Sequence, residues 1–321
     1  MEIEDYWLGI LMLAEKVKHS EENIDYCFLQ LGAEPEVRIN HLPVPVKDSL
    51  LLMIIANPEL EMSHEQASVF RLDTYTVHIV QNMGLPEEAK EFLTAYLPYC
   101  FLPLQARKMG RAVAITHFAQ SLDGRIATQS GDSKWIGNEE NLVHAHRMRA
   151  LCDSILIGAN TLNFDQPALT VRLVEGKNPQ RIVICSSDAD FSSLQEKCKD
   201  DVIIVGTCDD PQIPQTEYFP FEPNAKGRID CHALLRFLYQ RSLYSVYIEG
   251  GSATTSGFME EKATDIVQLH IAPIIFGSGV SSFNLTEITH VQQAVQFDSF
   301  FFRPMGNTYM FVGAMNVGNN A

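Results

Sequence analysis

The stretch Ser121–Arg172 decides the fold, and it reads SLDGRIATQSGDSKWIGNEENLVHAHRMRALCDSILIGANTLNFDQPALTVR. Residues Glu139–Leu151 have the pattern of a helix, and the apolar run Ser154–Gly158 after them is typical of a buried strand that ends in a glycine turn. A helix, a buried strand and a glycine turn in succession indicate an α/β protein. Ligands of such sheets bind beyond the carboxyl ends of the strands, so this turn is a candidate site.

The same alternation continues on both sides of this stretch. The predicted strands are Ala112–Ala119, Arg181–Cys185, Val202–Gly206, Ser245–Glu249 and Ile266–Ala272, and the predicted helices are Cys231–Gln240 and Ser252–Glu261. Residues Val295–Arg303 and Thr308–Val312 are predicted to form a hairpin that closes the edge of the sheet. The fold class is therefore α/β, with a central, mostly parallel sheet, flanking helices and a C-terminal hairpin.

A separate, smaller N-terminal domain is predicted, because the chain of 321 residues exceeds the usual size of one domain. Between Leu97 and Arg111, two prolines, two basic residues and a glycine interrupt the regular periodicity, which places a boundary there. Before it, Asp5–Val17 and Pro86–Leu97 have helical patterns, and Leu50–Ala56 is a continuous apolar run. We expect domains at 1–110 and 111–321, and the first displays no recognisable chemistry.

Charge and composition restrict the partners. The chain has 40 acidic and 24 basic residues, a net charge of -16, and an ordinary globular composition with 46% hydrophobic residues. Such a charge repels phosphate backbones, so we expect no nucleic-acid partner. A small anionic ligand stays possible where basic residues converge.

The cysteines and the N-terminal residues indicate a cytoplasmic protein. Seven scattered cysteines without a CxxC pair argue against a disulfide framework and against a structural zinc site, so no metal is expected. The start, MEIED, is acidic where a signal peptide needs positive charge, and no apolar run approaches the length of a membrane span. We therefore expect no membrane association.

Two glycine-rich turns follow predicted strands, at Gly158-Ala-Asn-Thr161 and at Glu249-Gly250-Gly251. Glycine permits close approach of a ligand to the backbone, and a helix N-terminus favours a phosphate. Taken singly, a glycine after a strand is more often a tight turn, and neither segment has the spacing of GxGxxG or of a phosphate loop. A nucleotide bound here would therefore use a binding loop of another kind than these two motifs.

Several side chains near these turns are candidates for binding. Arg149, Arg172 and Lys134 can supply local positive charge, although helix-end and surface salt-bridge roles are equally ordinary for them. Trp135 can stack on a planar ring or anchor its loop. His144 and His146 are two apart on a helix and face different directions, so we expect solvated residues and not a metal pair.

Taken together, the motifs resemble the reductase domain of the riboflavin-biosynthesis deaminase-reductase family over about residues 111–315. The resemblance rests on these segments in this order: Ser121-Leu-Asp-Gly-Arg, Ser133-Lys-Trp-Ile, Gly158-x-x-Thr161-x-x-x-Asp165-x-Pro-x-Leu169-Thr-x-Arg172, Glu249-Gly-Gly and Ala272-Pro-x-x-x-Gly277. It implies a dihydrofolate-reductase-like fold, a homodimer, and NADPH-dependent reduction of the ribosyl group of a phosphoribosylaminopyrimidine.

The resemblance also implies roles for individual residues. Asp165 and Glu249 are the implied catalytic residues. The implied cofactor-binding residues are Gly158, Thr161, Asp165, Ser186, Gly250 and Gly251. The implied substrate-binding residues are His117, Ser133, Trp135, Arg149, Leu169, Arg172 and Glu249, with the arginines serving the sugar phosphate.

Three departures from the family pattern leave alternatives open. His117 stands where the family usually carries a lysine that contacts the pyrimidine. Asp188 and Asp190 stand where a basic residue often holds the NADPH phosphate, so NADH is an alternative cofactor. Residues 1–110 lack the zinc signature of the deaminase half. A reductase of pterin-like substrates and a catalytically silent binding protein are the alternative functions.

Overall fold

The computed structural model describes all residues except 44–48, 135, 186–188, 193–201 and 316–321. The chain divides into two compact units, Met1–Met109 and Gly110–Ala321. Trp135 and Ser186, both predicted to bind ligands, lie outside the described residues.

The first unit contains a sheet of order β2-β1-β3-β4-β5. Its strands are β1 (Tyr26–Leu31), β2 (Glu36–Ile39), β3 (Leu50–Ile55), β4 (Ala67–Asp73) and β5 (Thr76–Gln81). Its helices are α1 (Ile3–Lys18), α2 (Glu87–Tyr96) and α3 (Leu102–Met109). The two helices expected from the sequence, α1 and α2, are confirmed, and the apolar run from Leu50 supplies the buried strand β3.

The segment from Leu97 to Arg111 differs from the expectation, because most of it is helical. The 3-10 helix η1 (Leu97–Phe101) continues directly into α3. Pro98 and Pro103 lie in the first turns of these helices, where a backbone N–H has no intrahelical partner to lose. Leu97 and Phe101 are completely buried, so apolar packing holds the segment in place despite its prolines.

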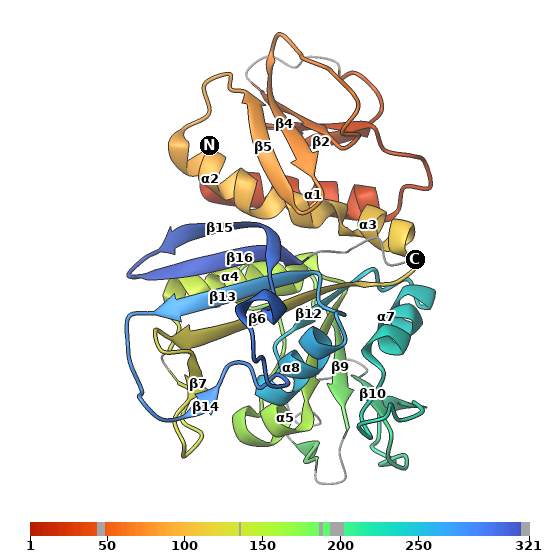
Figure 1. The fold of residues 1–321 in the computed structure, drawn as a ribbon. Coiled ribbons are helices and arrows are strands. Elements are labelled where there is room, and N and C mark those ends of the chain that lie inside the picture. Colours follow the sequence, from red (N-terminus) through yellow and green to blue (C-terminus); the bar gives the residue numbers. More distant parts are fainter. Residues whose placement is uncertain (44–48, 135, 186–188, 193–201, 316–321) are drawn as a thin grey trace. The chain divides into compact units, whose positions relative to one another are not determined.

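The second unit is built on a nine-stranded sheet, counted over the described residues, of order β11-β10-β9-β8-β12-β6-β13-β16-β15 (Figure 1). Its strands are β6 (Val113–Ser121), β8 (Ser154–Gly158), β9 (Gln180–Ile184), β10 (Val202–Gly206), β11 (Thr216–Pro220), β12 (Ser245–Ile248), β13 (Ile266–Ala272), β15 (Phe297–Met305) and β16 (Thr308–Met315). Neighbours from β11 to β13 are parallel, whereas β16 is antiparallel to both β13 and β15. The mostly parallel sheet and its closing hairpin are confirmed.

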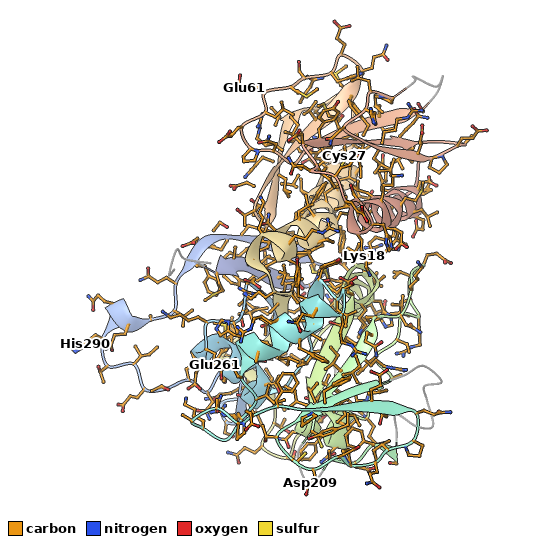
Figure 2. All side chains as sticks on the ribbon, turned by 90° about the vertical axis from the view of Figure 1, so that its right-hand side faces the viewer. Lys18, Cys27, Glu61, Asp209, Glu261 and His290 are labelled. Atoms are coloured by element: carbon orange, nitrogen blue, oxygen red, sulfur yellow. The ribbon has the colours of Figure 1, made fainter. Side chains whose placement is uncertain are left out.

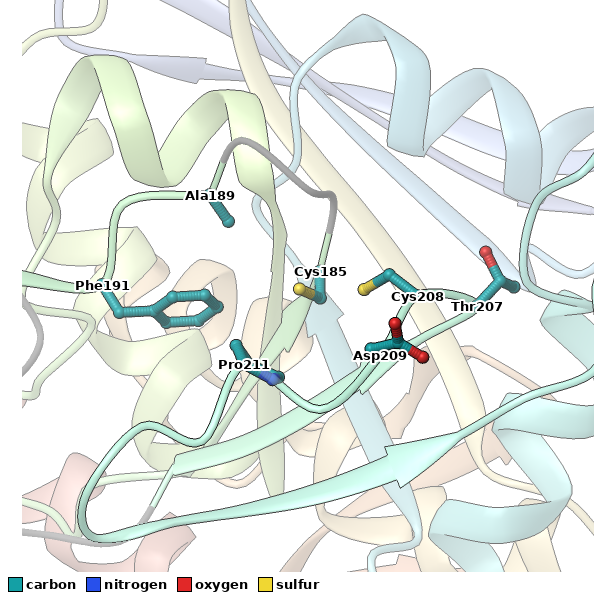
Figure 3. Close-up of a pocket in the computed structure, with 7 residues that line it drawn as sticks. All are labelled: Cys185, Ala189, Phe191, Thr207, Cys208, Asp209 and Pro211. Carbon is teal, nitrogen blue, oxygen red and sulfur yellow. The ribbon is translucent and has the colours of Figure 1, made fainter.

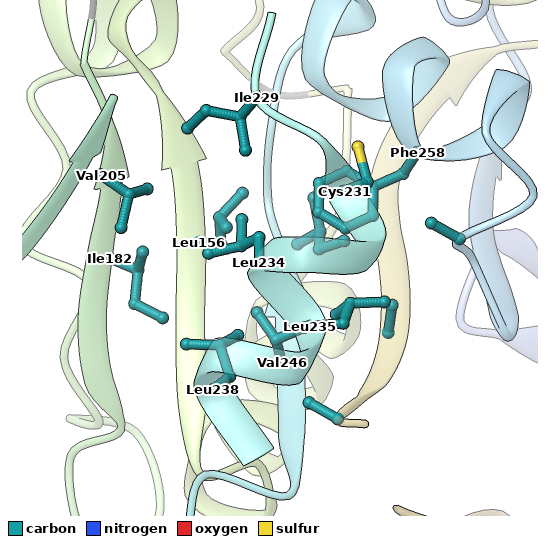
Figure 4. Close-up of a cluster of buried hydrophobic side chains, with 14 of the residues drawn as sticks. Leu156, Ile182, Val205, Ile229, Cys231, Leu234, Leu235, Leu238, Val246 and Phe258 are labelled. Atoms are coloured by element: carbon teal, nitrogen blue, oxygen red, sulfur yellow. The ribbon is translucent and has the colours of Figure 1, made fainter. Parts of the chain in front are cut away.

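Helices cover both faces of this sheet. On one face, α7 (Cys231–Gln240) places Leu234, Leu235 and Leu238 in a buried cluster with residues of β8, β9, β10 and β12, and Phe258 of α8 (Ser252–Glu260) joins it (Figure 4). Helices α4 (Glu139–Leu151) and α5 (Ala159–Asp165) pack on the other face. Fully burying each leucine contributes roughly 2 kcal/mol, so this cluster is a main source of the sheet's rigidity.

Glu261, labelled in Figure 2, connects α7 and α8. Its carboxylate accepts hydrogen bonds from the backbone N–H of Cys231 (2.7 Å) and from the Asn224 side chain (2.7 Å). The residue that ends α8 therefore caps the first turn of α7. Within the described residues, no helix has the length and apolar character that crossing a membrane requires.

Candidate active site

Two neighbouring parallel strands, β8 and β12, end beside the middle of β6, the next strand of the sheet. The backbone N–H of Glu249, just after β12, donates to the carbonyl of Leu156 in β8 (3.0 Å). Ile248 is aligned with Leu156 on one side and with Thr116 on the other, so the next residues, Glu249 and His117, lie side by side. The sheet thus brings together segments that are far apart in the sequence.

The two glycine turns meet where β8 and β12 end. Gly158 is the N-cap of α5 and Gly251 is the N-cap of α8. The Gly251 N–H donates to Thr161 Oγ1 over 3.0 Å, which ties one turn to the other. A Cβ on Gly250 would lie 2.7 Å from the Cβ of Thr254, and a Cβ on Gly158 would lie 2.5 Å from Thr254 Oγ1. The Thr254 side chain therefore leaves no room for a Cβ at Gly250 or Gly158.

Glu249 forms a buried ion pair with Arg149 of α4. Arg149 Nε lies 2.8 Å from Glu249 Oε1 and Nη2 lies 2.6 Å from Oε2, while Nη1 donates to the Thr170 carbonyl (3.2 Å). Burial opposes the charged form, but the guanidinium outweighs it and lowers the pKa of Glu249 below its ordinary value. The carboxylate is consequently ionised at neutral pH and fixed in direction.

His146 and Arg149, three residues apart on α4, hold the loop after α5. The backbone N–H of Arg172 donates to His146 Nδ1 (2.9 Å), and the Arg172 guanidinium donates to Thr170 Oγ1 (2.7 Å). His146 is 4% exposed, and burial together with the two arginines lowers its pKa to about 4. The expectation of a solvated residue is wrong for His146, because accepting this loop hydrogen bond requires a neutral, buried imidazole.

His117 lies beside the ion pair in a buried aromatic cluster. Its ring stacks on Tyr247 at 5.4 Å and lies 5.8 Å from the ring of His144. His144 faces Gln268 Oε1 at 3.2 Å and is 1% exposed, so it too is not the solvated residue that was expected. Burial is the main cause that lowers the pKa of His117 to about 4. This position is therefore neutral at pH 7.

Asp165 lies at the end of α5, on the side of Ser133 and Lys134. Partial burial raises the pKa of Asp165 above its ordinary value, and this effect outweighs the hydrogen bond with Ser133 and the charge of Lys134, which both lower the pKa. The backbone that follows is strained, because Gln166 and Leu169 have φ angles of 43° and 55°. Non-glycine residues in this region are common at functional sites, and here the strain folds the loop back toward α4.

Comparison with known proteins identifies the second unit. Residues 112–303 match the model of the RibD C-terminal domain, which is more than half of the chain. The chain belongs to this family.

Individual relatives agree with this assignment. The chain is 34% identical over 175 residues to the 2,5-diamino-6-ribosylamino-4(3H)-pyrimidinone 5′-phosphate reductase of Methanothermobacter thermautotrophicus, covering 52% of this chain and 80% of that protein. It is 28% identical over 237 residues to RibD of Synechocystis, covering 72% of this chain and 63% of that protein.

Solved structures support the fold. Acinetobacter baumannii RibD covers 98% of this chain and 99% of its own, with a TM-score of 0.63 at 16% identity. The yeast riboflavin biosynthesis reductase covers 64% of this chain and 90% of its own, with a TM-score of 0.52 at 19% identity. The fold class expected from the sequence is confirmed.

The predicted residues of the candidate site form two groups. His117, Arg149, Glu249 and Arg172 gather around the ion pair, whereas Asp165 and Ser133 form the second group. Leu169 is 1% exposed in the apolar cluster of β8 and β9, so only its backbone is available to a ligand.

Four further residues contact the predicted ones in the candidate site and were not predicted from the sequence. They are His146, Thr170, Tyr247 and Thr254. The His146-x-x-Arg149 spacing was a usable signal, since residues three apart share a helix face. Thr170, Tyr247 and Thr254 have no signal of this kind, because their contacts with Arg149, His117 and Gly158 join different segments of the chain.

Two RibD motifs have a structural role. The Asp123 carboxylate accepts hydrogen bonds from Ser121 Oγ (2.7 Å) and from the backbone N–H groups of Phe276 (3.1 Å) and Gly277 (2.8 Å). The Ser-Leu-Asp-Gly turn after β6 therefore holds the turn after β13 beside it, next to the small sheet of β7 (Arg125–Ala127) and β14 (Val280–Ser281).

Proposed function

We propose that this chain is a nicotinamide-dependent reductase that transfers hydride to the ribosylamino carbon of a phosphorylated ribosylaminopyrimidine. One observation carries the proposal: two glycine turns and a buried, ionised glutamate converge at the carboxyl ends of neighbouring parallel strands. The name of the 34% identical archaeal relative gives the substrate class.

The nucleotide would be held by the glycine turns. The pyrophosphate would lie at the N-terminus of α8 beside Gly250 and Gly251, where the Gly251 N–H already donates to Thr161 Oγ1, and Gly158 and Thr161 would border the nicotinamide. The bound nicotinamide supplies the hydride. The protein's contribution is orientation, because a rigid site that aligns two reacting carbons lowers the barrier by several kcal/mol.

Glu249 and Asp165 have different roles in this scheme. Glu249 is held ionised by Arg149, so it stabilises positive charge that develops on an iminium-like substrate carbon and does not donate a proton. Asp165 has a pKa raised above its ordinary value by burial, so it takes up a proton more readily than an exposed aspartate and is the candidate for proton transfer.

The substrate is bound through its phosphate and its ring. Arg172 is exposed, and Arg149 uses three of its five N–H donors in the bonds to Glu249 and Thr170, so both can reach a phosphate. His117, Ser133, Trp135 and the backbone of Leu169 would contact the rest of the substrate. Nδ1 of His117 is buried without a partner among the described residues, which leaves it for a heterocycle.

The decisive experiment measures binding and turnover separately. Nicotinamide fluorescence reports binding of NADPH and NADH, and loss of nicotinamide absorbance after addition of the phosphoribosylaminopyrimidine reports turnover. We expect both signals. Binding with turnover of a dihydropterin alone would favour the pterin reductase, and failure to bind either nucleotide would leave the silent binding protein.

The exposed hairpin supports a homodimer. Phe300, Phe302 and Tyr309 on β15 and β16 are 61%, 57% and 59% exposed, although β15 is the edge strand of the sheet. Exposed apolar edge strands pair with other chains, and a second copy of the hairpin is the partner we propose.

We also propose a cytoplasmic location, which fits cysteines that carry no disulfide among the described residues. NADPH is the family's cofactor and NADH the alternative.

A further inference from the structure

Two cysteines line a cavity of about 470 Å³ at the carboxyl ends of β9 and β10 (Figure 3). Cys185 directly follows β9, and Cys208 lies in the loop after β10. The two strands are parallel neighbours, and the backbone N–H of Cys185 donates to the Val205 carbonyl of β10 (2.8 Å). Both thiols are half-buried, and neither is in a disulfide. The sheet topology therefore brings two reduced thiols from separate segments to one opening.

Gly206 provides the space between these cysteines. A Cβ at this position would lie 3.1 Å from Cys185 Cβ and 3.2 Å from Cys208 Sγ, so the two side chains flank the same point. The φ angle of Gly206 is not in the left-handed region, so the backbone conformation does not demand a glycine here. The missing side chain instead leaves the two cysteines within reach of each other, and Figure 3 shows the Cys208 sulfur directed toward Cys185.

Tyr218 of β11 gives a second measure of how close the two thiols are. Its hydroxyl donates to the backbone carbonyl of Cys208 and lies 3.4 Å from that of Gly206. Burial is the main cause that raises the pKa of Tyr218, and Cys208 and Cys185 raise it further. Because both cysteines act on one hydroxyl, both lie beside it, in agreement with the geometry at Gly206.

The other described cysteines are of a different kind. Cys27, Cys100, Cys152 and Cys231 are buried. Burial raises the pKa of each of these thiols, to about 12 for Cys27, and so suppresses the thiolate that attacks disulfides. Cys198 lies outside the described residues. Among the described cysteines, a reagent that enters the cavity therefore meets the half-buried pair.

We propose that Cys185 and Cys208 are a redox-modification site, at which they form a reversible disulfide by exchange with a small disulfide such as glutathione disulfide. The thiolate of one cysteine attacks glutathione disulfide, forms a mixed disulfide and releases one glutathione. The other cysteine attacks the protein sulfur of the mixed disulfide, forms the intramolecular bond and releases the second glutathione. The protein thus loses two electrons and two protons, and glutathione disulfide takes up both.

Forming this bond requires only local movement. The side chains must rotate to bring the sulfurs to bonding distance, and the loop after β10, which has no regular secondary structure, allows for the adjustment. The bond would tie the end of β9 to this loop. Disulfides of proteins in a reducing compartment are usually transient and redox-sensing, which fits the proposed cytoplasmic location.

Thiol mapping of the full chain tests the inference. The reduced protein is incubated with glutathione disulfide, denatured, alkylated with N-ethylmaleimide and digested for mass spectrometry. We expect the loss of two alkylated cysteines, a cross-linked peptide pair that contains Cys185 and Cys208, no retained glutathione, and full reversal by dithiothreitol. Cys208→Ser should instead retain one glutathione on Cys185, because no second thiol displaces it. Cys198→Ser is the matched control and should leave the cross-link unchanged.

A third variant tests the geometry. Gly206→Ala fills the space between the two side chains, so it should slow formation of the cross-link and leave alkylation of each single thiol by N-ethylmaleimide unchanged. The inference is overturned if both cysteines stay alkylated after treatment with glutathione disulfide, if both retain glutathione, or if the cross-link runs through Cys198. None of these measurements involves turnover, so failure of the proposed reductase function would leave the inference standing.

Discussion

Removing either partner of the Arg149–Glu249 pair should destabilise the second unit strongly. The two side chains are 12% and 18% exposed and are joined by two hydrogen bonds of 2.8 and 2.6 Å. Breaking a buried pair leaves an uncompensated charge and typically costs about 3–5 kcal/mol. We expect about 3 kcal/mol for Glu249→Gln, which retains one acceptor, and more for Arg149→Met, which also releases the Thr170 carbonyl.

The double variant separates the energy of the ion pair from the other effects of each substitution on stability. Replacing both residues, as Arg149→Met with Glu249→Gln, leaves no buried charge, so its cost should be smaller than the sum of the single costs by about 2 kcal/mol. The pH dependence adds a check. Because the folded pKa of Glu249 is depressed, its stabilisation is complete above the ordinary glutamate pKa and is lost as the pH falls through the folded value.

Urea denaturation of the full chain at pH 7, followed by far-UV circular dichroism, gives these free energies. Hydrogen exchange of the peptide covering α4 assigns the loss to this unit. Glu249→Gln should also lower kcat by about 100-fold, the usual effect of losing one preorganised electrostatic partner. Single costs below about 1 kcal/mol, or strict additivity in the double variant, would refute the reasoning.

Three further outcomes are expected. The pKa of His117 is about 4 in the folded protein against an ordinary 6.5, so the free energy of unfolding should fall by about 3 kcal/mol as the pH is lowered from 6.5 to 4. In urea titrations, His117→Gln should reduce this pH dependence. An unchanged pH dependence would contradict the assignment. Gly158→Ala should lower the melting temperature, and Thr254→Ala should restore it, because the new Cβ clashes with Thr254 Oγ1 and lies 3.9 Å from Thr254 Cβ. Thr254→Ala should not restore Gly250→Ala, because that clash is with Thr254 Cβ itself. Equal rescue of both variants would be inconsistent with this geometry. Phe302→Glu should convert a dimer to a monomer in sedimentation experiments with little loss of stability, and an unchanged sedimentation coefficient would exclude the hairpin as the interface.

Much of the second unit could be predicted because its signals are local. Ser154–Gly158 and Val202–Gly206 are short apolar runs bounded by turn residues, and both are the strands β8 and β10 with the predicted bounds. The segment from Leu97 to Arg111 failed for the opposite reason. Its prolines are local breakers in general, but here they occupy first turns, and burial of the surrounding side chains decides the conformation.

The sequence predicted which residues belong to the candidate site, but not which of them contact one another. Arg149 was expected to serve a phosphate, and only the packing of α4 against β12 shows that Glu249 takes most of its hydrogen bonds. His144 and His146 look like solvated helix residues in sequence, because helical spacing does not tell which parts of a helix other elements cover.

The sequence by itself determined the α/β class, the order of strands and helices along the chain, and the RibD-type residues. Tertiary structure alone decided that β8, β12 and β6 are neighbours, that the glycine turns touch through Thr161, and that burial lowers the pKa values of His117 and His146. The reason is physical. Periodicity and turn chemistry act over a few residues, whereas strand order, burial and the local dielectric depend on contacts between residues that are 100 apart, as for Arg149 and Glu249, or 154 apart, as for Asp123 and Gly277.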